Sequence, residues 1–223
     1  MTWASKIIAF CKQLEIRASL PSGVEVLNPF ADKVIVRYCS QFYHKYYNDE
    51  NSRTLIFGIN PGRFGGGLTG IPFTDPKKLE EVCGIKNDLP KRAELSADFI
   101  HKMMLEFGGL TTFYQRFYFT SISPLGFTRS GKNLNYYDMK VLQSAVEPFV
   151  LKCIRQQIDF GAKTSIAFCL GEGANFKYFS NLNKQHSFFD EIVPLPHPRF
   201  VMQYKRKQLP LYIAKYVAAL GRA

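Results

Sequence analysis

Four short apolar runs along the chain predict the strands of one sheet. They cover residues 54–58, 117–121, 164–170 and 191–195. The first and third runs are apolar at almost every position, which is typical of strands that are covered on both faces in a parallel sheet. Ligands bind such sheets beyond the carboxyl ends of the strands, so the residues that follow each run are the first candidates for a site.

Helical periodicity fills most of the chain around these runs. Residues 2–15 have the apolar spacing of an amphipathic helix. A second helix is expected directly after Asn28, because asparagine is a good N-cap and Pro29 would take the first helical position. Further helices are expected near 76–83, 97–107, 138–160 (as two segments around Pro148), 173–181 and 208–220.

The alternation of strands and helices predicts a three-layer α/β/α fold with a mainly parallel, four-stranded central sheet. The length of 223 residues fits one domain over 1–223, and no repeat or low-complexity linker divides it. Hydrophobic residues make up 46% of the chain and charged residues 21%, which are the values of a globular protein.

The formal net charge of +11 favours a polyanionic partner, either nucleic acid or an anionic membrane, over a basic surface without a partner. No run reaches 18 apolar residues, so we expect no membrane span and no membrane partner. Lys6 and Lys12 interrupt the first helix, which does not fit the core of a signal peptide. We therefore expect a protein that works inside the cell.

The spacing of cysteine and histidine predicts no metal site. The five cysteines lie far apart, without a C-x-x-C pair, and the four histidines do not pair at ligand spacing. Each cysteine lies in an apolar context, so we interpret all five as buried thiols in a reducing compartment. No cofactor is expected either.

The segment after the first predicted strand, residues 58–73, holds six glycines and two prolines in sixteen positions. Such a segment is a shaped loop that lets a ligand approach the backbone closely. It lacks the Gly-Lys-Ser/Thr of a phosphate-binding loop, and its glycines do not open a helix as a dinucleotide fingerprint requires. Its four large apolar residues argue against a plain surface loop.

Polar and basic residues follow the other three strands. Ser121 ends the second, and a Gly171–Gly173 turn follows the third, where a helix start could hold a phosphate. His197 stands between two prolines after the fourth strand. Residues 199–207 then interleave cations with Phe, Val, Met and Tyr. We interpret them as a loop that contacts phosphates and inserts an apolar wedge into a base stack, and the alternative is a charged face leading into the last helix.

These segments resemble the active-site motifs of the SMUG family, the single-strand-selective monofunctional uracil-DNA glycosylases. The family's first motif runs Gly-Met-Asn-Pro-Gly, then Phe-Gly, then Thr-Gly-Val-Pro-Phe. This chain has GINPG at 58–62, FG at 64–65 and TGIPF at 69–73. Shorter motifs at 121–125, 170–173 and 197–199 follow in the family's order, so the resemblance covers about 54–210.

Two departures distinguish the chain from that pattern. Ser121 stands where the family has an asparagine that reads the uracil edge. The family's second motif is usually His-Pro-Ser-Pro-Arg, and aligned without a gap it places Leu195 on the catalytic histidine, whereas a two-residue gap places His197 there. We choose His197, because leucine cannot hydrogen-bond a leaving group. Both departures point to the second, bacterial branch of the family.

The resemblance implies a role for each residue that matches a motif. Asn60 would orient the attacking water, and His197 would donate a hydrogen bond to O2 of the departing uracil. The base would be held by Ile59, Gly62, Phe73 and Ser121, with Phe73 as the stacking ring. No lysine matches a catalytic position, so the expected activity is glycosylase without strand cleavage. Uracil is the expected base, with deaminated purines as a further class that serine leaves room for.

The expected partner is DNA that contains uracil or a deaminated base. Its backbone would be bound by Gly171, Gly173, Arg199, Lys205, Arg206 and Lys207. We expect a monomer in the bacterial cytoplasm, at the nucleoid through its DNA. Two alternatives remain: a non-catalytic nucleic-acid-binding protein on the same fold, and an enzyme acting on free nucleosides. The presence of both Asn60 and His197 disfavours the first, and the net charge disfavours the second.

Overall fold

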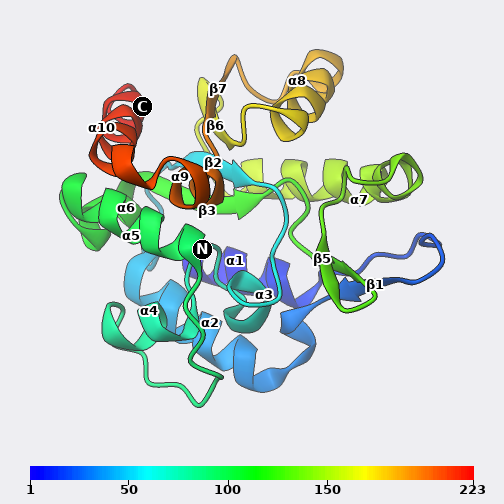
Figure 1. Ribbon diagram of the computed structural model, residues 1–223, viewed down its shortest axis with the longest axis horizontal. Coiled ribbons are helices and arrows are strands. Elements are labelled where there is room, and N and C mark those ends of the chain that lie inside the picture. The colour runs from blue at the N-terminus through cyan, green and yellow to red at the C-terminus, as the bar shows by residue number, and fades with distance from the viewer.

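The computed structural model describes all residues, 1–223, and its centre is a sheet of four parallel strands in the order β3-β2-β6-β7 (Figure 1). These strands are β2 (Thr54–Gly58), β3 (Phe117–Ser121), β6 (Ile166–Leu170) and β7 (Glu191–Leu195). The prediction of four parallel strands is confirmed, and only the third begins two residues later than expected. Every residue of β2, β3 and β6 is buried, which explains their continuous apolar sequence.

Ten α-helices surround this sheet, together with two short 3₁₀ turns. They are α1 (Trp3–Lys12), α2 (Lys33–Tyr46), α3 (Gly66–Thr69), α4 (Pro76–Glu81), α5 (Leu95–Glu106), α6 (Leu110–Arg116), α7 (Lys140–Ile158), α8 (Ala174–His186), α9 (Pro198–Tyr204) and α10 (Leu209–Leu220), with η1 at Pro29–Ala31 and η2 at Arg206–Gln208. None of them combines the length and the apolarity that a membrane span requires.

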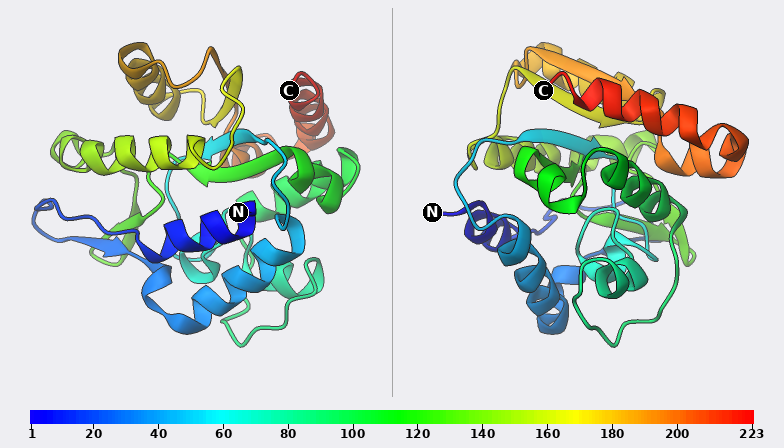
Figure 2. Two further views of the ribbon diagram at one scale, coloured as in Figure 1. Left: turned by 180° about the vertical axis from the view of Figure 1, so that it is seen from behind. Right: turned by 90° about the vertical axis from the view of Figure 1, so that its left-hand side faces the viewer.

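Helices cover both faces of the sheet, as the layers in Figure 2 show. On one face the ring of Tyr118 packs on Trp3 of α1, with 5.6 Å between ring centroids, and Phe57 packs on Phe179 of α8 at 4.6 Å. On the other face Phe119 stacks on a ring of α6. Neighbouring residues of a strand point to opposite faces, so β2 and β3 each contribute to both halves of the core. The three-layer architecture is therefore confirmed.

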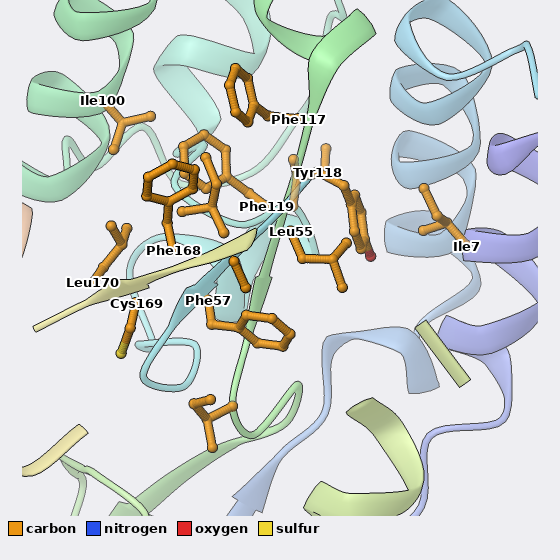
Figure 3. Packing of buried hydrophobic residues seen from close by; sticks show 14 of the residues in the cluster. Ile7, Leu55, Phe57, Ile100, Phe117, Tyr118, Phe119, Phe168, Cys169 and Leu170 are labelled. Carbon is orange, nitrogen blue, oxygen red and sulfur yellow. The ribbon is translucent and has the colours of Figure 1, made fainter. Parts of the chain in front are cut away.

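The two halves form one connected hydrophobic cluster of 53 buried residues. Figure 3 shows Phe119 and Phe168 on the side of the sheet toward Ile100, and Tyr118 on the side toward Ile7. All five cysteines are free and buried, as their apolar contexts predict. Burial of this extent provides the main driving force for folding.

A second, smaller sheet was not expected from the sequence. Its antiparallel strands are β1 (Val24–Leu27), β4 (Gly126–Arg129) and β5 (Lys132–Leu134), in the order β1-β4-β5. The β4–β5 hairpin turns at Ser130 and Gly131, which both have positive φ, as the common two-residue hairpin turn requires. This sheet matters for function because β5 delivers residues to the site described below.

Three helical predictions need correction. Asn28 caps only the 3₁₀ turn η1, and α2 begins later, at Lys33, where Asp32 accepts a hydrogen bond from the amide of Val34. Helix α7 is continuous through Pro148 rather than two segments, because buried residues before and after the proline pack into the core. Residues 198–204 form α9 and not a loop: Pro198 takes the first helical position and supplies the required φ.

Candidate active site

A cavity of about 380 Å³ lies beyond the carboxyl ends of β2, β3 and β7. Parallel strands bring these ends to one edge of the sheet, which is the place where such folds bind ligands. Its lining residues come from the long loop after β2, the end of β3, the segment around β5, and the starts of α5 and α9. They are Ile59, Asn60, Pro61, Gly62, Gly66, Pro72, Phe73, Glu94, Ser96, Ser121, Asn133, Asn135, His197, Arg199 and Gln203.

The side chain of Asn60 is held at both ends, by β5 and by the segment directly after it. Its Nδ2 donates to the carbonyl of Leu134 at 3.2 Å, and its Oδ1 accepts from the amide of Tyr136 at 3.0 Å. These two bonds fix which end of the amide is oxygen. A carbonyl oxygen has two lone pairs, so Oδ1 can accept one further hydrogen bond from a water molecule in the cavity.

His197 is the N-cap of α9, and its ring is half-buried at the cavity. Its Nδ1 accepts a hydrogen bond from the amide of Arg199 at 3.2 Å. Burial, together with the positive charge of Arg199, lowers the pKa of His197 to about 4. The ring is therefore neutral at physiological pH, and because Nδ1 is an acceptor, the proton lies on Nε2, which becomes a fixed donor.

Phe73 adopts a left-handed backbone conformation, with φ of 53°, which is rare for a bulky residue. Its ring packs on Phe119 at 5.1 Å and lies 6.4 Å from the ring of His197. Gly58 leaves space for it: a Cβ there would lie 3.1 Å from Cζ of Phe73. Strain of this kind concentrates at binding sites, where the surrounding structure enforces one orientation.

Ser121 reaches the cavity and its neighbour Thr120 does not. The hydroxyl of Thr120 is committed on the opposite face of β3, where it donates to Oε1 of Gln157. The alternation of side chains along β3 turns Ser121 toward Gly58 and the cavity, with its Oγ 3.3 Å from the position of a Cβ on Gly58. A further space of about 30 Å³, the size of one water molecule, lies behind Ser121.

Glu94, directly before α5, is a cavity residue that no sequence pattern indicated. Burial and the nearby Asp75 raise the pKa of Glu94 to about 7, while Arg199 acts in the opposite direction. Glu94 is joined to Asp75 through its backbone, since its amide donates to Oδ2 of Asp75 at 2.8 Å. Asn133 in β5 and Asn135 directly after it were also missed, because the second sheet was not predicted.

The structure separates the predicted site residues into two groups. Seven line the one cavity: Ile59, Asn60, Gly62, Phe73, Ser121, His197 and Arg199. The other five, Gly171, Gly173, Lys205, Arg206 and Lys207, lie outside it.

Leu195 is 1% exposed at the end of β7, within the core, so it cannot reach the cavity. Lys205, Arg206 and Lys207 are exposed beyond the end of α9. Gly171 has φ of 114°, and Gly173 precedes α8. No three side chains of His, Cys, Asp or Glu gather in a way that could hold a metal ion.

Comparison with known proteins gives one family and a similar solved structure. A family model described as the Uracil DNA glycosylase superfamily matches residues 44–221. The crystal structure of wild-type SMUG2 from Pedobacter heparinus is 47% identical in sequence, with a TM-score of 0.97, and the match covers 100% of this chain and 98% of that chain. No curated protein sequence matches the chain.

Proposed function

Because the chain belongs to the uracil DNA glycosylase superfamily, we propose that it hydrolyses the N-glycosidic bond of uracil in DNA and leaves an abasic site. The observation that carries the proposal is the pairing of Asn60 and His197 at one cavity, each held in a fixed orientation. Asn60 offers an acceptor and His197 a donor, and hydrolysis of this bond needs one of each.

Asn60 positions the water in this proposal. Loss of uracil leaves positive charge on the sugar, so the attacking water needs orientation rather than a strong base. The Oδ1 atom, which already accepts a hydrogen bond from the amide of Tyr136, accepts a second hydrogen bond from the water. This contact directs a lone pair of the water toward the sugar. Because the water is already positioned, the entropy of ordering it is not lost in the chemical step.

His197 stabilises the departing base in this proposal. Its Nε2–H is the free donor of a neutral ring, and it donates to uracil O2 as negative charge develops there. A preorganised donor aimed at developing charge is worth roughly 3–4 kcal/mol of transition-state stabilisation. Because the ring is neutral, the stabilisation comes from the Nε2–H dipole and not from a positive charge on the histidine.

The base must leave the helical stack to enter the cavity, which costs a few kcal/mol. Phe73 then stacks on the base, while Ile59, Gly62 and Ser121 contact its edges. On the outside, Phe200 and Tyr204 of α9 are 44% and 72% exposed with their rings 5.6 Å apart. We assign them the wedge, since they follow the site directly along the helix.

The DNA backbone is bound by cations around this wedge. Arg199 lies at the cavity, and Lys205, Arg206 and Lys207 extend the positive surface beyond α9. The turn at Gly171 and Gly173, before α8, adds backbone amides for a further phosphate. The protein acts on DNA as a monomer, in the bacterial cytoplasm.

The product of the reaction tests this proposal. An oligonucleotide with a single uracil is incubated with the protein, and half of the sample is then heated in alkali. We expect strand breaks only after alkali, because no lysine lines the cavity to form a Schiff base with the sugar. Spontaneous breaks together with a borohydride-trapped protein–DNA adduct would contradict the monofunctional assignment, and intact strands after alkali would refute uracil excision.

A further inference from the structure

Two arginines share one aromatic ring at the rim of the cavity. The guanidinium carbon of Arg63 lies 4.5 Å from the ring centroid of Phe64, and that of Arg92 lies 4.9 Å from the same centroid. Both arginines are exposed, while the ring of Phe64 is half-buried. Both arginines are close in sequence to residues that line the cavity: Arg63 follows Gly62, and Arg92 lies two residues before Glu94.

Contacts with neighbouring segments hold this stack together. The carboxylate of Glu94 packs directly on Gly65, where a Cβ would come within 1.9 Å of Oε2. That contact brings residue 92 close to residue 64. On the other side, the amide of Arg63 donates to Oδ1 of Asn133 at 3.1 Å. The two arginines are therefore placed by the same loops that form the cavity.

The charges of these arginines are not compensated within the chain. Eight ion pairs occur in the structure, and neither Arg63 nor Arg92 takes part in one. Two guanidinium groups near one ring repel each other, and an anion that contacts both offsets this repulsion. Guanidinium forks match the oxygens of a phosphate, and a ring that restrains them reduces the entropy lost on binding.

We propose that Arg63 and Arg92, oriented by Phe64, form a two-armed clamp for one backbone phosphate of the DNA strand that holds the target nucleotide. The clamp rests on the proposed function, since it needs a DNA strand entering this cavity. It lies on the loop after β2 and on the segment before α5, whereas Arg199 and residues 205–207 belong to α9 and the turn that follows it. The clamp thus adds a phosphate contact to those assigned to α9.

Binding measurements with charge-removing variants test the clamp. Arg63→Gln, Arg92→Gln and the double variant are titrated with an oligonucleotide carrying an abasic-site analogue, at several salt concentrations. Lys163→Gln is the matched control, because Lys163 is equally exposed but lies before β6, at the amino edge of the sheet. We expect the double variant to bind about 10-fold more weakly than wild type. The slope of log K against log salt concentration should become shallower by about one, which corresponds to the loss of one phosphate contact.

The same oligonucleotide with neutral methylphosphonate linkages, placed one at a time around the target, identifies the anion. One linkage should weaken wild type about 10-fold and leave the double variant unchanged, because that variant has already lost the contact. The clamp is refuted if the double variant behaves like Lys163→Gln, or if every linkage weakens both proteins equally. Excision of uracil by wild type is measured separately. If wild type excises uracil but no linkage distinguishes it from the double variant, the clamp is refuted and the proposed function is not.

Discussion

At the scale of single residues, Ser121 and Phe73 face each other across Gly58. A Cβ on Gly58 would lie 3.3 Å from Oγ of Ser121 and 3.1 Å from the ring of Phe73. The proposed stacking ring and the residue that would read the base edge therefore meet at one wall of the cavity. A serine hydroxyl is short and rotates, so it donates or accepts as the base requires, whereas an asparagine offers one fixed donor and one fixed acceptor.

We predict from this arrangement that Ser121→Asn narrows the base range. Asparagine would add a bidentate contact to the uracil edge and fill space that a purine needs. Selectivity for uracil over xanthine and hypoxanthine should rise by roughly 1–3 kcal/mol, the usual worth of one bidentate contact. The measurement is the single-turnover excision rate of both proteins on three oligonucleotides. A wild type that cuts uracil alone, with a variant no more selective, would show that Ser121 does not set the base range.

Positions at the cavity could be predicted from the sequence only where a motif fixed the register. The long motif at 58–73 placed Asn60 and Phe73 without ambiguity, and both line the cavity. The shorter motif after β7 left Leu195 and His197 as alternatives, and burial of Leu195 in the core distinguishes them. Glu94 had no signal at all, because its position depends on the folding of two distant loops against each other.

At the scale of elements, a buried network links the second sheet to the central one behind Asn60. The hydroxyl of Tyr136 donates to Oδ1 of Asn175 at 2.8 Å, and Nδ2 of Asn175 donates to the carbonyl of Leu170 at 3.0 Å. Both side chains are at most 1% exposed. The amide of Tyr136 also donates to Oδ1 of Asn60, so the network fixes the backbone that orients this side chain.

Removing one hydroxyl tests that link. Tyr136→Phe should lower the free energy of unfolding by about 1–2 kcal/mol, because Oδ1 of Asn175 loses its donor in the core. We also expect kcat to fall about 3-fold to 10-fold with KM unchanged, as for an interaction that acts only in the transition state. Tyr137→Phe is the matched control, since Tyr137 is the adjacent, half-buried tyrosine. Equal kcat values for both variants and wild type would leave Tyr136 a purely structural residue.

Elements were predictable in proportion to the apolar area that they bury. The strands β2, β3 and β6 are fully buried, so their apolar runs identified them. The second sheet has strands of three or four residues with largely exposed faces, and such strands carry no alternating pattern. Helix α9 was mistaken for a loop because Arg199, the cations directly after the helix and the exposed aromatics hide its buried positions, Pro198, Val201 and Met202.

At the scale of the whole molecule, the edge of one parallel sheet collects the proposed chemistry. Residues that are distant in sequence, Asn60, Ser121 and His197, meet at a single cavity because β2, β3 and β7 end there. The net charge of +11 provides the attraction for DNA, and the arginines around the cavity give that attraction a direction. The position of the site was predictable, since parallel strands bring their carboxyl ends to one edge of the sheet.

The central claim is that Asn60 and His197 act together on a uracil in that cavity. The test is the excision rate of wild type, Asn60→Ala and His197→Ala under single-turnover conditions, with each protein in saturating excess over uracil-containing DNA. We predict that each variant is slower by at least ~100-fold, because each loses a transition-state interaction while DNA binding is retained. A variant that excises uracil at a rate within about 10-fold of wild type would contradict the role assigned to that residue.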